Sequence, residues 1–226
     1  MADHHSSPGP AIVAPLPKGK IILKIIVLGS SNVGKTSLMK RYATGKFSDV
    51  RRATVGTDYL TRKLVINDTD VLIQIWDTAG QEKFHQGTIG NSFYKGSNGC
   101  LLVYDVNNDR SYDQIMQWRD ELFGRLGKDK YFPVVVVGNK IDLRTEENRL
   151  ENQEDILKWC QENSYGHIEA SAKDDIGVEA AMQAVAALAL DEHRLSPNGI
   201  SCERRTDTVN LEEIYSNDKR KNCGCS

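Results

Sequence analysis

The most informative segment of this chain is GSSNVGKTS at residues 29–37. It follows the apolar run IILKIIVL at residues 21–28, and apolar side chains recur at helical spacing after it. A strand, a glycine-rich turn and a helix in this order are the context in which G-x-x-x-x-G-K-S/T predicts a phosphate-binding loop. The alternative is a chance glycine-rich loop, which the flanking strand disfavours. The motif therefore indicates a nucleotide ligand, without saying which nucleotide.

Each part of this motif supplies a different contact to phosphate. The glycines permit backbone geometry in which successive N–H groups converge on phosphate oxygens. The positive N-terminus of the following helix faces the same anion. Lys35 is expected to reach the β- and γ-phosphates, and the Thr36 hydroxyl is expected to ligate Mg²⁺. The nucleotide-binding residues predicted here are Ser31, Asn32, Val33, Gly34, Lys35, Thr36 and Ser37.

Length and composition limit the class of protein. With 226 residues, of which 39% are hydrophobic, the chain fits one globular domain with tails. A net charge of −2 disfavours a nucleic-acid-binding protein. No apolar run approaches the ~18 residues of a membrane span, and the N-terminus lacks a secretory signal. Cys100 and Cys160 lie in apolar segments and three cysteines crowd the tail, so we expect reduced thiols in the cytosol.

Strand and helix patterns alternate along the middle of the chain. Two alternating runs at residues 59–66 and 71–76, separated by turn-forming residues, predict an antiparallel hairpin. Continuous aliphatic runs at residues 101–104 and 134–137 predict parallel strands that are buried on both faces. Apolar spacing predicts helices at residues 115–126, 155–163 and 178–190, with a last strand at 167–170. We therefore expect an α/β fold with a mostly parallel six-stranded sheet, one antiparallel edge hairpin and helices on both faces.

The two ends of the chain differ from this middle part. Residues 1–20 contain four of the six prolines and show no periodicity, which predicts a flexible arm. Residues 193–226 have few aliphatic side chains and charges of both signs, which predicts a disordered tail. The globular domain is expected to span residues 21–192.

Two further loops point to guanine. Asn139-Lys140-Ile141-Asp142 follows one buried strand, and Ser171-Ala172-Lys173 follows the next. A fixed carboxylate such as Asp142 can accept from the N1–H and N2–H₂ donors of guanine at once. Asn139 can tie this loop to the phosphate loop and contact N7, and the Ala172 N–H can donate to O6. By itself N-K-x-D also fits an ordinary solvated loop, but its position favours GTP or GDP, bound through Asn139, Lys140, Asp142, Ser171, Ala172 and Lys173.

These motifs, in this order, carry a family resemblance. The phosphate loop, Thr54, DTAGQ at 77–81, NKID and SAK resemble the Ras-like small GTPases. WDTAGQEKF, FYKG at 93–96 and the paired terminal cysteines narrow the resemblance to the Rab branch. WRDE at 118–121, FPVVVVGNKIDL at 132–143 and Trp159-Cys160 are similar to its late-endosomal and lysosomal (vacuolar) members. The resemblance covers residues 20–192 and the extreme C-terminus.

The resemblance implies a P-loop small G domain and a role for each matching residue. Thr54 would complete Mg²⁺ coordination only when a γ-phosphate is present, and Asp77 would hold the metal through water. The Gly80 N–H would contact the γ-phosphate, and Gln81 would orient the attacking water as the catalytic residue. Phe47 would pack on the guanine ring. The implied metal residues are Thr36, Thr54 and Asp77.

The resemblance also implies partners. Tyr59, Trp76 and Phe93 match an aromatic triad that presents the nucleotide state to effectors, although ordinary core residues are the alternative. No arginine occupies residues 30–33, and an arginine finger is worth roughly 10³–10⁵ in rate, so hydrolysis is expected to be slow without an activating protein. The other implied partners of this monomeric G domain are an exchange factor and prenyl escort and extraction proteins.

The C-terminus predicts a lipid anchor. Cys223-Gly224-Cys225-Ser226 is not a C-a-a-X ending, because Cys225 occupies a position that should be aliphatic. It resembles the Rab double-cysteine signal, shifted by Ser226. Two prenyl groups at Cys223 and Cys225 would be a sufficient anchor where one chain binds marginally, and the basic residues 219–221 would add about 1 kcal/mol per charge. We expect the cytoplasmic face of late endosomes, lysosomes or vacuoles, with a cytosolic pool.

Some features depart from the family pattern, and other functions fit part of it. Arg51 stands where relatives usually have tyrosine, and it is either a solvated charge or a partial arginine finger in cis. Eight residues separate Phe84 from Phe93, two more than the family pattern.

Three alternative functions fit part of the pattern. They are a non-hydrolysing GTP-binding scaffold, disfavoured by Gln81 and Thr54; a P-loop kinase or ATPase, disfavoured by NKID; and a Rab GTPase of another trafficking step.

Overall fold

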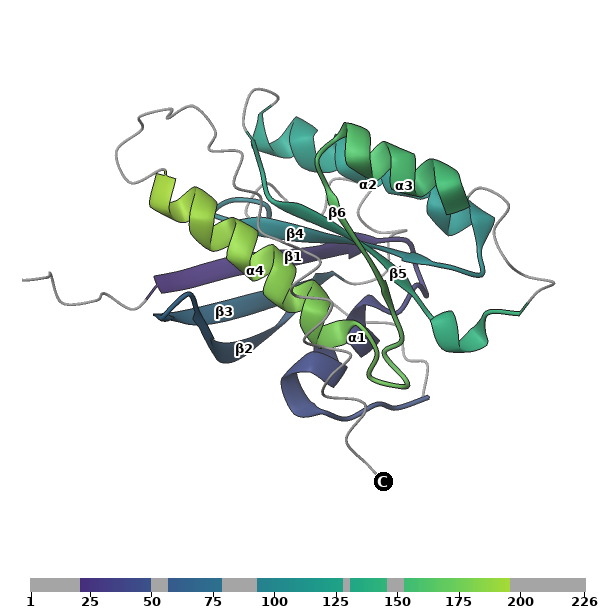
Figure 1. Ribbon diagram of the computed structural model, residues 1–226, viewed down its shortest axis with the longest axis horizontal. Helices are drawn as coiled ribbons and strands as arrows, with labels where there is room; N and C mark the ends of the chain where they lie inside the picture. Colours follow the sequence, from purple (N-terminus) through teal and green to yellow (C-terminus); the bar gives the residue numbers. More distant parts are fainter. Residues whose placement is uncertain (1–20, 50–56, 79–92, 128–130, 146–152, 196–226) are drawn as a thin grey trace, which may run out of the picture.

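A single six-stranded sheet organises the computed structural model, which describes residues 21–49, 57–78, 93–127, 131–145 and 153–195. The strand order is β2-β3-β1-β4-β5-β6, and only the edge strand β2 runs antiparallel to its neighbour (Figure 1). The predicted parallel sheet with an edge hairpin is therefore confirmed. The strands are β1 (Ile21–Gly29), β2 (Thr57–Ile66), β3 (Thr69–Thr78), β4 (Gly99–Asp105), β5 (Val134–Asn139) and β6 (Gly166–Ala170).

Helices cover both faces of this sheet, as expected (Figure 1). On one face lie α1 (Lys35–Thr44) and α4 (Val178–Leu195), and on the other lie α2 (Asp109–Leu126) and α3 (Gln153–Glu162). Successive side chains of a strand point to opposite faces, so each central strand supplies both cores. In β1, Val27 packs with α1 and α4, whereas Leu28 packs with α2 and α3. This double burial explains the continuous apolar runs in the sequence.

Three helices differ in length from their predictions, the first being α2, which begins at Asp109 and not at residue 115. The helix expected at residues 155–163 spans Gln153–Glu162, and the one expected at 178–190 continues to Leu195. The extension of α4 agrees with the sequence, since the first helix-breaking residue after Leu190 is Pro197. The α4 helix thus extends past residue 192, where we expect the globular domain to end.

The two cysteines of the described part behave as core residues. Cys100 and Cys160 are buried and free, as the apolar spacing predicts. Burial raises the pKa of the Cys100 thiol, and it raises the pKa of the Cys160 thiol to about 12. Both therefore stay protonated and unreactive at neutral pH.

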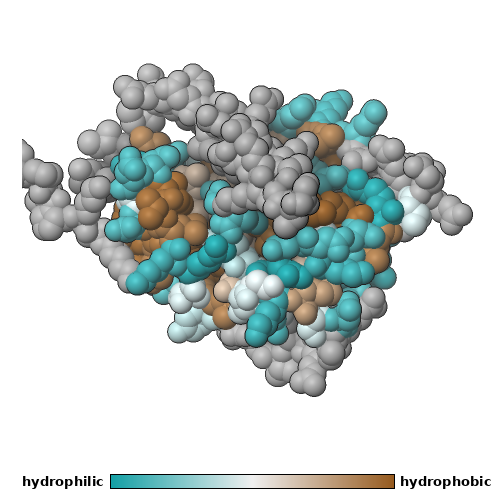
Figure 2. Space-filling model, turned by 60° about the horizontal axis from the view of Figure 1, so that its bottom comes forward, coloured by the Kyte–Doolittle hydropathy of each residue, from teal (hydrophilic) through white to brown (hydrophobic). Residues whose placement is uncertain are grey.

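The surface is mostly hydrophilic on the face drawn in Figure 2, where apolar side chains form separate patches between polar ones. Across the described residues, none of the helices combines the length and apolar character needed to cross a bilayer.

The topology brings the predicted motifs to one edge of the sheet. Because β1, β3, β4, β5 and β6 are mutually parallel, their carboxyl ends lie along the same edge. Strand order changes direction at β1, whose neighbours β3 and β4 follow it in the chain on opposite sides. In open α/β sheets, ligands bind outside the carboxyl ends of the strands at such a switch point.

Candidate nucleotide-binding site

The phosphate loop joins β1 to α1, and two of its glycines are required by close packing. Gly29 has φ of 145°, and a Cβ there would lie 2.1 Å from the Val103 carbonyl oxygen. Gly34 has φ of 96°, and a Cβ there would lie 2.3 Å from Nδ2 of Asn139. Any larger residue would push β4 or the NKID loop away. The two glycines of the motif therefore hold the loop against the two neighbouring strand ends.

The loop presents a buried cation and a helix N-terminus to the same place. Lys35 is only 6% exposed, and its Nζ donates to the carbonyls of Gly29 (2.7 Å) and Ser30 (2.8 Å). Helix α1 starts at Lys35 with Gly34 as its N-cap, and no side chain caps it. Because the first N–H groups of a helix lack partners within the helix, this end suits an anion.

Thr36 and Asp77 bring two oxygen ligands together next to this loop. The Thr36 hydroxyl donates to Oδ2 of Asp77, whose side chain is fully buried near the end of β3. The β1–β3 pairing, which sets Val27 opposite Asp77, creates this contact. Mg²⁺ is usually held by one or two protein oxygens together with phosphates and water, and these two side chains fit that donor set. Across the described residues, no group of three or more His, Cys, Asp or Glu side chains forms a metal site.

Asn139 connects three loops at the carboxyl end of β5. Its Nδ2 donates to the Val33 carbonyl (2.8 Å), which confirms the predicted tie to the phosphate loop. Its Oδ1 accepts from the Ala172 N–H (3.2 Å), the group that we expect to donate to guanine O6. Asn139 is 1% exposed, so folding alone fixes the position of its side chain.

Asp142 is held by the other predicted base-binding loop. It lies in a 3₁₀ turn at Ile141–Leu143, and its Oδ1 accepts a hydrogen bond from the Ser171 hydroxyl (2.7 Å). Ser171 is fully buried at the end of β6 and accepts from the Asp174 N–H (2.9 Å). A carboxylate has about four lone-pair positions, so Asp142 keeps the capacity to accept from both guanine donors.

Further contacts tie these loops to the phosphate side. Arg41 of α1 donates to the carbonyls of Ala172 (2.8 Å) and Lys173 (2.6 Å). The Ser30 hydroxyl donates to Oε1 of Gln114 in α2 (2.6 Å). Sequence reasoning missed these contacts because they depend on strand order, which residue spacing does not reveal.

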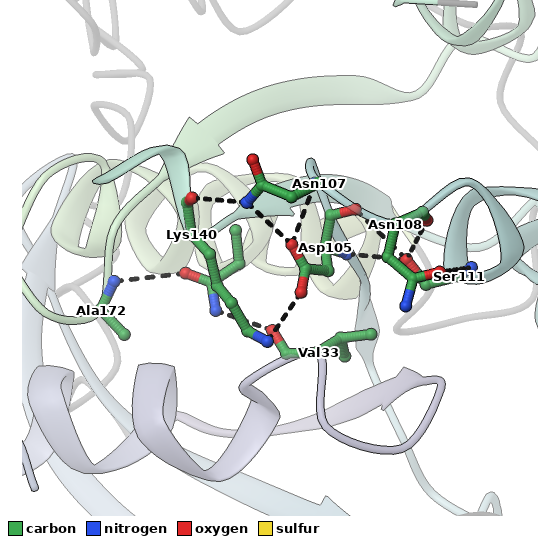
Figure 3. Close-up of polar contacts among 8 residues, drawn as sticks. Val33, Asp105, Asn107, Asn108, Ser111, Lys140 and Ala172 are labelled. Atoms are coloured by element: carbon green, nitrogen blue, oxygen red, sulfur yellow. Dashed lines mark hydrogen bonds and ion pairs between the residues drawn. The ribbon is translucent and has the colours of Figure 1, made fainter. Parts of the chain in front are cut away.

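Lys140 also has partners that the sequence did not indicate. Its Nζ forms an ion pair with Oδ2 of Asp105 (2.7 Å), and its carbonyl accepts from Nδ2 of Asn107 (3.0 Å; Figure 3). A usable signal existed, since Asp105 and Asn107 follow a buried strand just as Asn139 does.

The remaining predicted nucleotide contacts are less defined by the fold. Ser31 and Asn32 are exposed, and Asn32 has a left-handed backbone with φ of 63°. Phe47 is half-buried against the core beneath α1, with its ring 5.8 Å from the Arg41 guanidinium. Its contact with guanine stays a prediction. Val33 is buried and Ser37 is half-buried. The predicted residues Thr54, Gly80, Gln81, Cys223 and Cys225 lie outside the described part of the chain, as does Arg51.

The predicted aromatic triad does come together. The rings of Tyr59 and Trp76 are stacked with centroids 5.2 Å apart, and Phe93 meets Trp76 edge-on at 6.4 Å. Lys24 lies 4.5 Å above the Trp76 ring and donates to the Phe93 carbonyl (2.5 Å). Tyr59 is 54% exposed whereas Phe93 is 3% exposed. The cluster therefore joins the core to the surface, and its contact with effectors stays a prediction.

Comparison with known proteins agrees with this geometry. The sequence matches the Ras family over residues 24–191. It is similar to the Ypt/Rab-type GTPase avaA of Emericella nidulans, with 41% identity over 209 residues, 91% of this chain and 98% of that protein. It is 46% identical over 172 residues to the Ras-related protein Rab-7a of Dictyostelium discoideum, covering 75% of this chain and 83% of that protein. It is 40% identical over 198 residues to the Ypt/Rab-type GTPase ypt7 of Schizosaccharomyces pombe, covering 86% and 94%.

Proposed function

The chain belongs to the Ras family of small GTPases, in its Rab branch, and we propose that it directs membrane traffic to late endosomes and lysosomes or vacuoles. As a Rab GTPase it binds GTP and GDP, hydrolyses GTP to GDP and acts as a molecular switch in membrane traffic. Similarity to proteins named Rab-7a and ypt7 supports the late-endosomal branch. So does the likeness of residues 118–121 and 132–143 to that branch.

One observation carries the assignment of the site. The ends of β1, β3 and β5 bring Lys35, Asp77 and Asp142 to the same edge of the sheet. A cation for phosphate, an oxygen ligand for a divalent metal and a carboxylate for guanine donors are the three functions that a GTP site requires. Asn139 joins the first and last of these through its bond to the phosphate loop.

Mg²⁺ is the cofactor that we infer for this site. Thr36, Asp77 and Thr54 would hold it, the first two through oxygens that already lie in contact. When bound, Mg²⁺ neutralises charge on the β- and γ-phosphates. The chain's own part would be to hold the Thr36 hydroxyl, at the start of α1, beside the Asp77 carboxylate, near the end of β3, before the nucleotide arrives.

Hydrolysis and switching would depend on the two loops around Thr54 and Gln81. Gln81 would orient the attacking water, and Thr54 and the Gly80 N–H would contact the γ-phosphate, so that order in both loops depends on it. Within the phosphate loop, the described positions 30–33 carry no cation. Slow hydrolysis that an activating protein accelerates follows from this composition.

The enzymatic part is tested by single-turnover hydrolysis on the full-length chain loaded with GTP. Slow phosphate release is expected, with at least tenfold slower release by Gln81→Leu and nearly unchanged GTP affinity, because Gln81 acts on water and not on the nucleotide. Excess ATP should not displace GTP. Absence of release would favour the non-hydrolysing scaffold, and displacement by ATP would favour a kinase or ATPase.

We also propose that prenyl groups on Cys223 and Cys225 anchor the protein to the cytoplasmic face of the membrane. Escort and extraction proteins would maintain a cytosolic pool. Two lipid chains are needed because one binds only marginally. In cells, the tagged chain should colocalise with a lysosomal marker, and the double Ser variant should become soluble, whereas Cys202→Ser should stay on membranes. Colocalisation with an earlier compartment, or a double variant that still pellets with membranes, would contradict the respective proposal.

A further inference from the structure

Residues at the end of β4 and in the loop that follows it bind both the side-chain ammonium and the backbone carbonyl of Lys140 (Figure 3). Oδ2 of Asp105 pairs with the Lys140 ammonium at 2.7 Å, and Nδ2 of Asn107 donates to the Lys140 carbonyl at 3.0 Å. The two holding residues are also bound to each other, since Oδ1 of Asp105 accepts from the backbone N–H (3.0 Å) and Nδ2 (3.1 Å) of Asn107. The three residues thus form a closed ring of contacts.

Lys140 needs such support because of its backbone conformation. Its φ of 68° is in the left-handed region, which residues with a Cβ seldom adopt because the Cβ crowds the backbone. The carbonyl that Asn107 binds also accepts from the Leu143 N–H (3.0 Å), which closes the turn carrying Asp142. The position of the Asp142 carboxylate therefore depends on the conformation that the ring imposes on Lys140 as well as on the hydrogen bond from Ser171.

The ring is itself fixed to the start of α2. The backbone N–H of Asp105 donates to the Ser111 hydroxyl (3.0 Å), and Asn108 caps α2 by accepting from the Ser111 N–H (3.2 Å). In the sheet, Asp105 is paired with Asn139, and Val106 donates to the Asn139 carbonyl (3.0 Å). The side chains of Asp105 and Lys140 are 13% and 19% exposed. This burial reduces screening by water compared with a surface pair.

We propose that Asp105 and Asn107 are positioning residues for guanine selection. They act through Lys140 and fix Asp142 where it accepts from both the N1–H and the 2-amino group of the base. The inference rests on the proposed function, since it concerns how the same site recognises a guanine nucleotide. Asn139 keeps its own ties to Val33 and Ala172, so loss of the ring should disturb Asp142 and leave the phosphate loop in place.

Dissociation rates of GDP and IDP from the full-length chain test this role, with Asp105→Ala and Asn107→Ala as the variants. IDP lacks the 2-amino group, so it makes one hydrogen bond to Asp142 where GDP makes two. A displaced carboxylate should therefore speed GDP release by about tenfold and IDP release by only about threefold, which narrows the preference for GDP. Asp105→Asn keeps an acceptor for Asn107 but loses the charge, and it should give an intermediate effect.

Two exposed residues of α2, changed in Asp109→Ala and Gln117→Ala, serve as matched controls and should leave both rates unchanged. If the ring variants lower the melting temperature but keep the wild-type ratio of GDP to IDP release, the ring is only structural and the proposal is wrong. Asn107→Ala keeps this test available should Asp105→Ala fail to fold. A wild-type chain that does not prefer GDP over IDP would instead contradict the proposed function.

Discussion

The base side and the phosphate side of the site are held together differently. On the base side, Asn139 and Asp142 bind other parts of the protein, the phosphate loop and Ser171, through contacts that a guanine nucleotide would leave in place. On the phosphate side, Lys35 donates to carbonyls of its own loop and Thr36 donates to Asp77. These are the groups that we propose for phosphate and metal, so binding would redirect them.

This difference separates two kinds of discrimination. The contacts of Asn139 with Val33 and of Asp142 with Ser171 form without a ligand, so changes on the base side should alter the choice among nucleotide bases. On the phosphate side, Lys35 and Thr36 would replace their present hydrogen-bond partners in the protein by phosphate and metal. Changes there should therefore alter the preference between GTP and GDP. The predictions on nucleotide binding and hydrolysis below test that division, and all predictions run from the largest expected effect to the smallest.

The largest effect is expected for Asp142→Asn on the base side. Two charge-assisted hydrogen bonds, each worth about 1.5–3 kcal/mol, would be lost, so GDP affinity should fall on the order of 10³-fold. XDP, which carries an oxygen in place of the 2-amino group, should bind this variant better than it binds the wild type. Equilibrium titration with fluorescent GDP and XDP measures both effects.

Asp174→Asn is the matched control for this substitution, because its exposed carboxylate lies in the neighbouring loop. It should leave both affinities unchanged. If Asp142→Asn weakened the binding of GDP and of XDP equally, the carboxylate would have no role in recognising the base. The base side would then not control base selection, and the proposed division of roles between the two sides of the site would be wrong.

A smaller effect, on the phosphate side, is expected for Thr36→Asn. Loss of the hydroxyl beside Asp77 should weaken GTP binding on the order of 10²-fold and GDP binding much less, because Thr36 would help to hold a Mg²⁺ that offsets the additional charge of the γ-phosphate. Titrations of both nucleotides in the presence and absence of Mg²⁺ measure the difference. Thr44→Asn, at the exposed far end of α1, is the control. An equal loss of affinity for GTP and GDP would contradict the proposed role of Thr36 as a metal ligand.

The sequence predicted the fold well because burial controls its pattern. Runs such as residues 134–137 are apolar because both faces of β5 are covered, and that pattern is visible without a structure. Motif spacing likewise placed the phosphate loop and NKID at strand ends. The tie between Asn139 and the phosphate loop followed from chemistry once both loops were placed at the same edge.

The missed contacts have a common physical cause. The pairs Asp105–Lys140 and Ser30–Gln114 join segments whose separation in the chain says nothing about their separation in space. They require the strand order, in which β4 lies between β1 and β5. Helix ends are also underdetermined, as α4 shows by continuing to Leu195 in the absence of a breaker.

A third prediction concerns the strands beneath the base side and their stability toward acid. The Tyr104 hydroxyl lies 3.0 Å from Nε2 of His167, above Gly138 of the intervening strand, where a Cβ would come within 2.7 Å of that hydroxyl. Burial lowers the pKa of His167, with a smaller opposing effect from Glu169 and a further lowering by Arg144. The unfolded chain therefore takes up a proton first, and stability should decline as the pH falls below 6.5.

His167→Gln keeps a polar partner for Tyr104 but cannot titrate. It should match wild-type stability near neutral pH to within about 1 kcal/mol, the net value of one hydrogen bond, and lose less stability in acid. Urea denaturation midpoints measured on both sides of pH 6.5 give the slope of stability against pH. The exposed His193 provides the control, since His193→Gln should keep the wild-type slope. If His167→Gln kept the wild-type slope, protonation of His167 would not be a cause of the loss of stability in acid.

The smallest effect is expected at Arg51, which stands in the sequence three residues before Thr54, a residue that we propose contacts the γ-phosphate. A guanidinium that reached the γ-phosphate would offset charge in the transition state, as an arginine finger does at roughly 10³–10⁵ in rate. An arginine solvated by water gains little from such a contact. We therefore expect Arg51→Tyr, which introduces the tyrosine that the family resemblance implies at this position, to change the rate of intrinsic single-turnover hydrolysis by less than about twofold.

The measurement is made without an activating protein, and Arg52→Tyr serves as the neighbouring control. A drop of about tenfold in Arg51→Tyr alone, or ~1.4 kcal/mol of barrier, would identify a finger supplied in cis. The phosphate side would then contain its own catalytic cation in addition to Lys35. It would no longer depend on a partner to complete it, and the contrast with the base side would be weaker. An unchanged rate leaves the activating protein as the source of that charge.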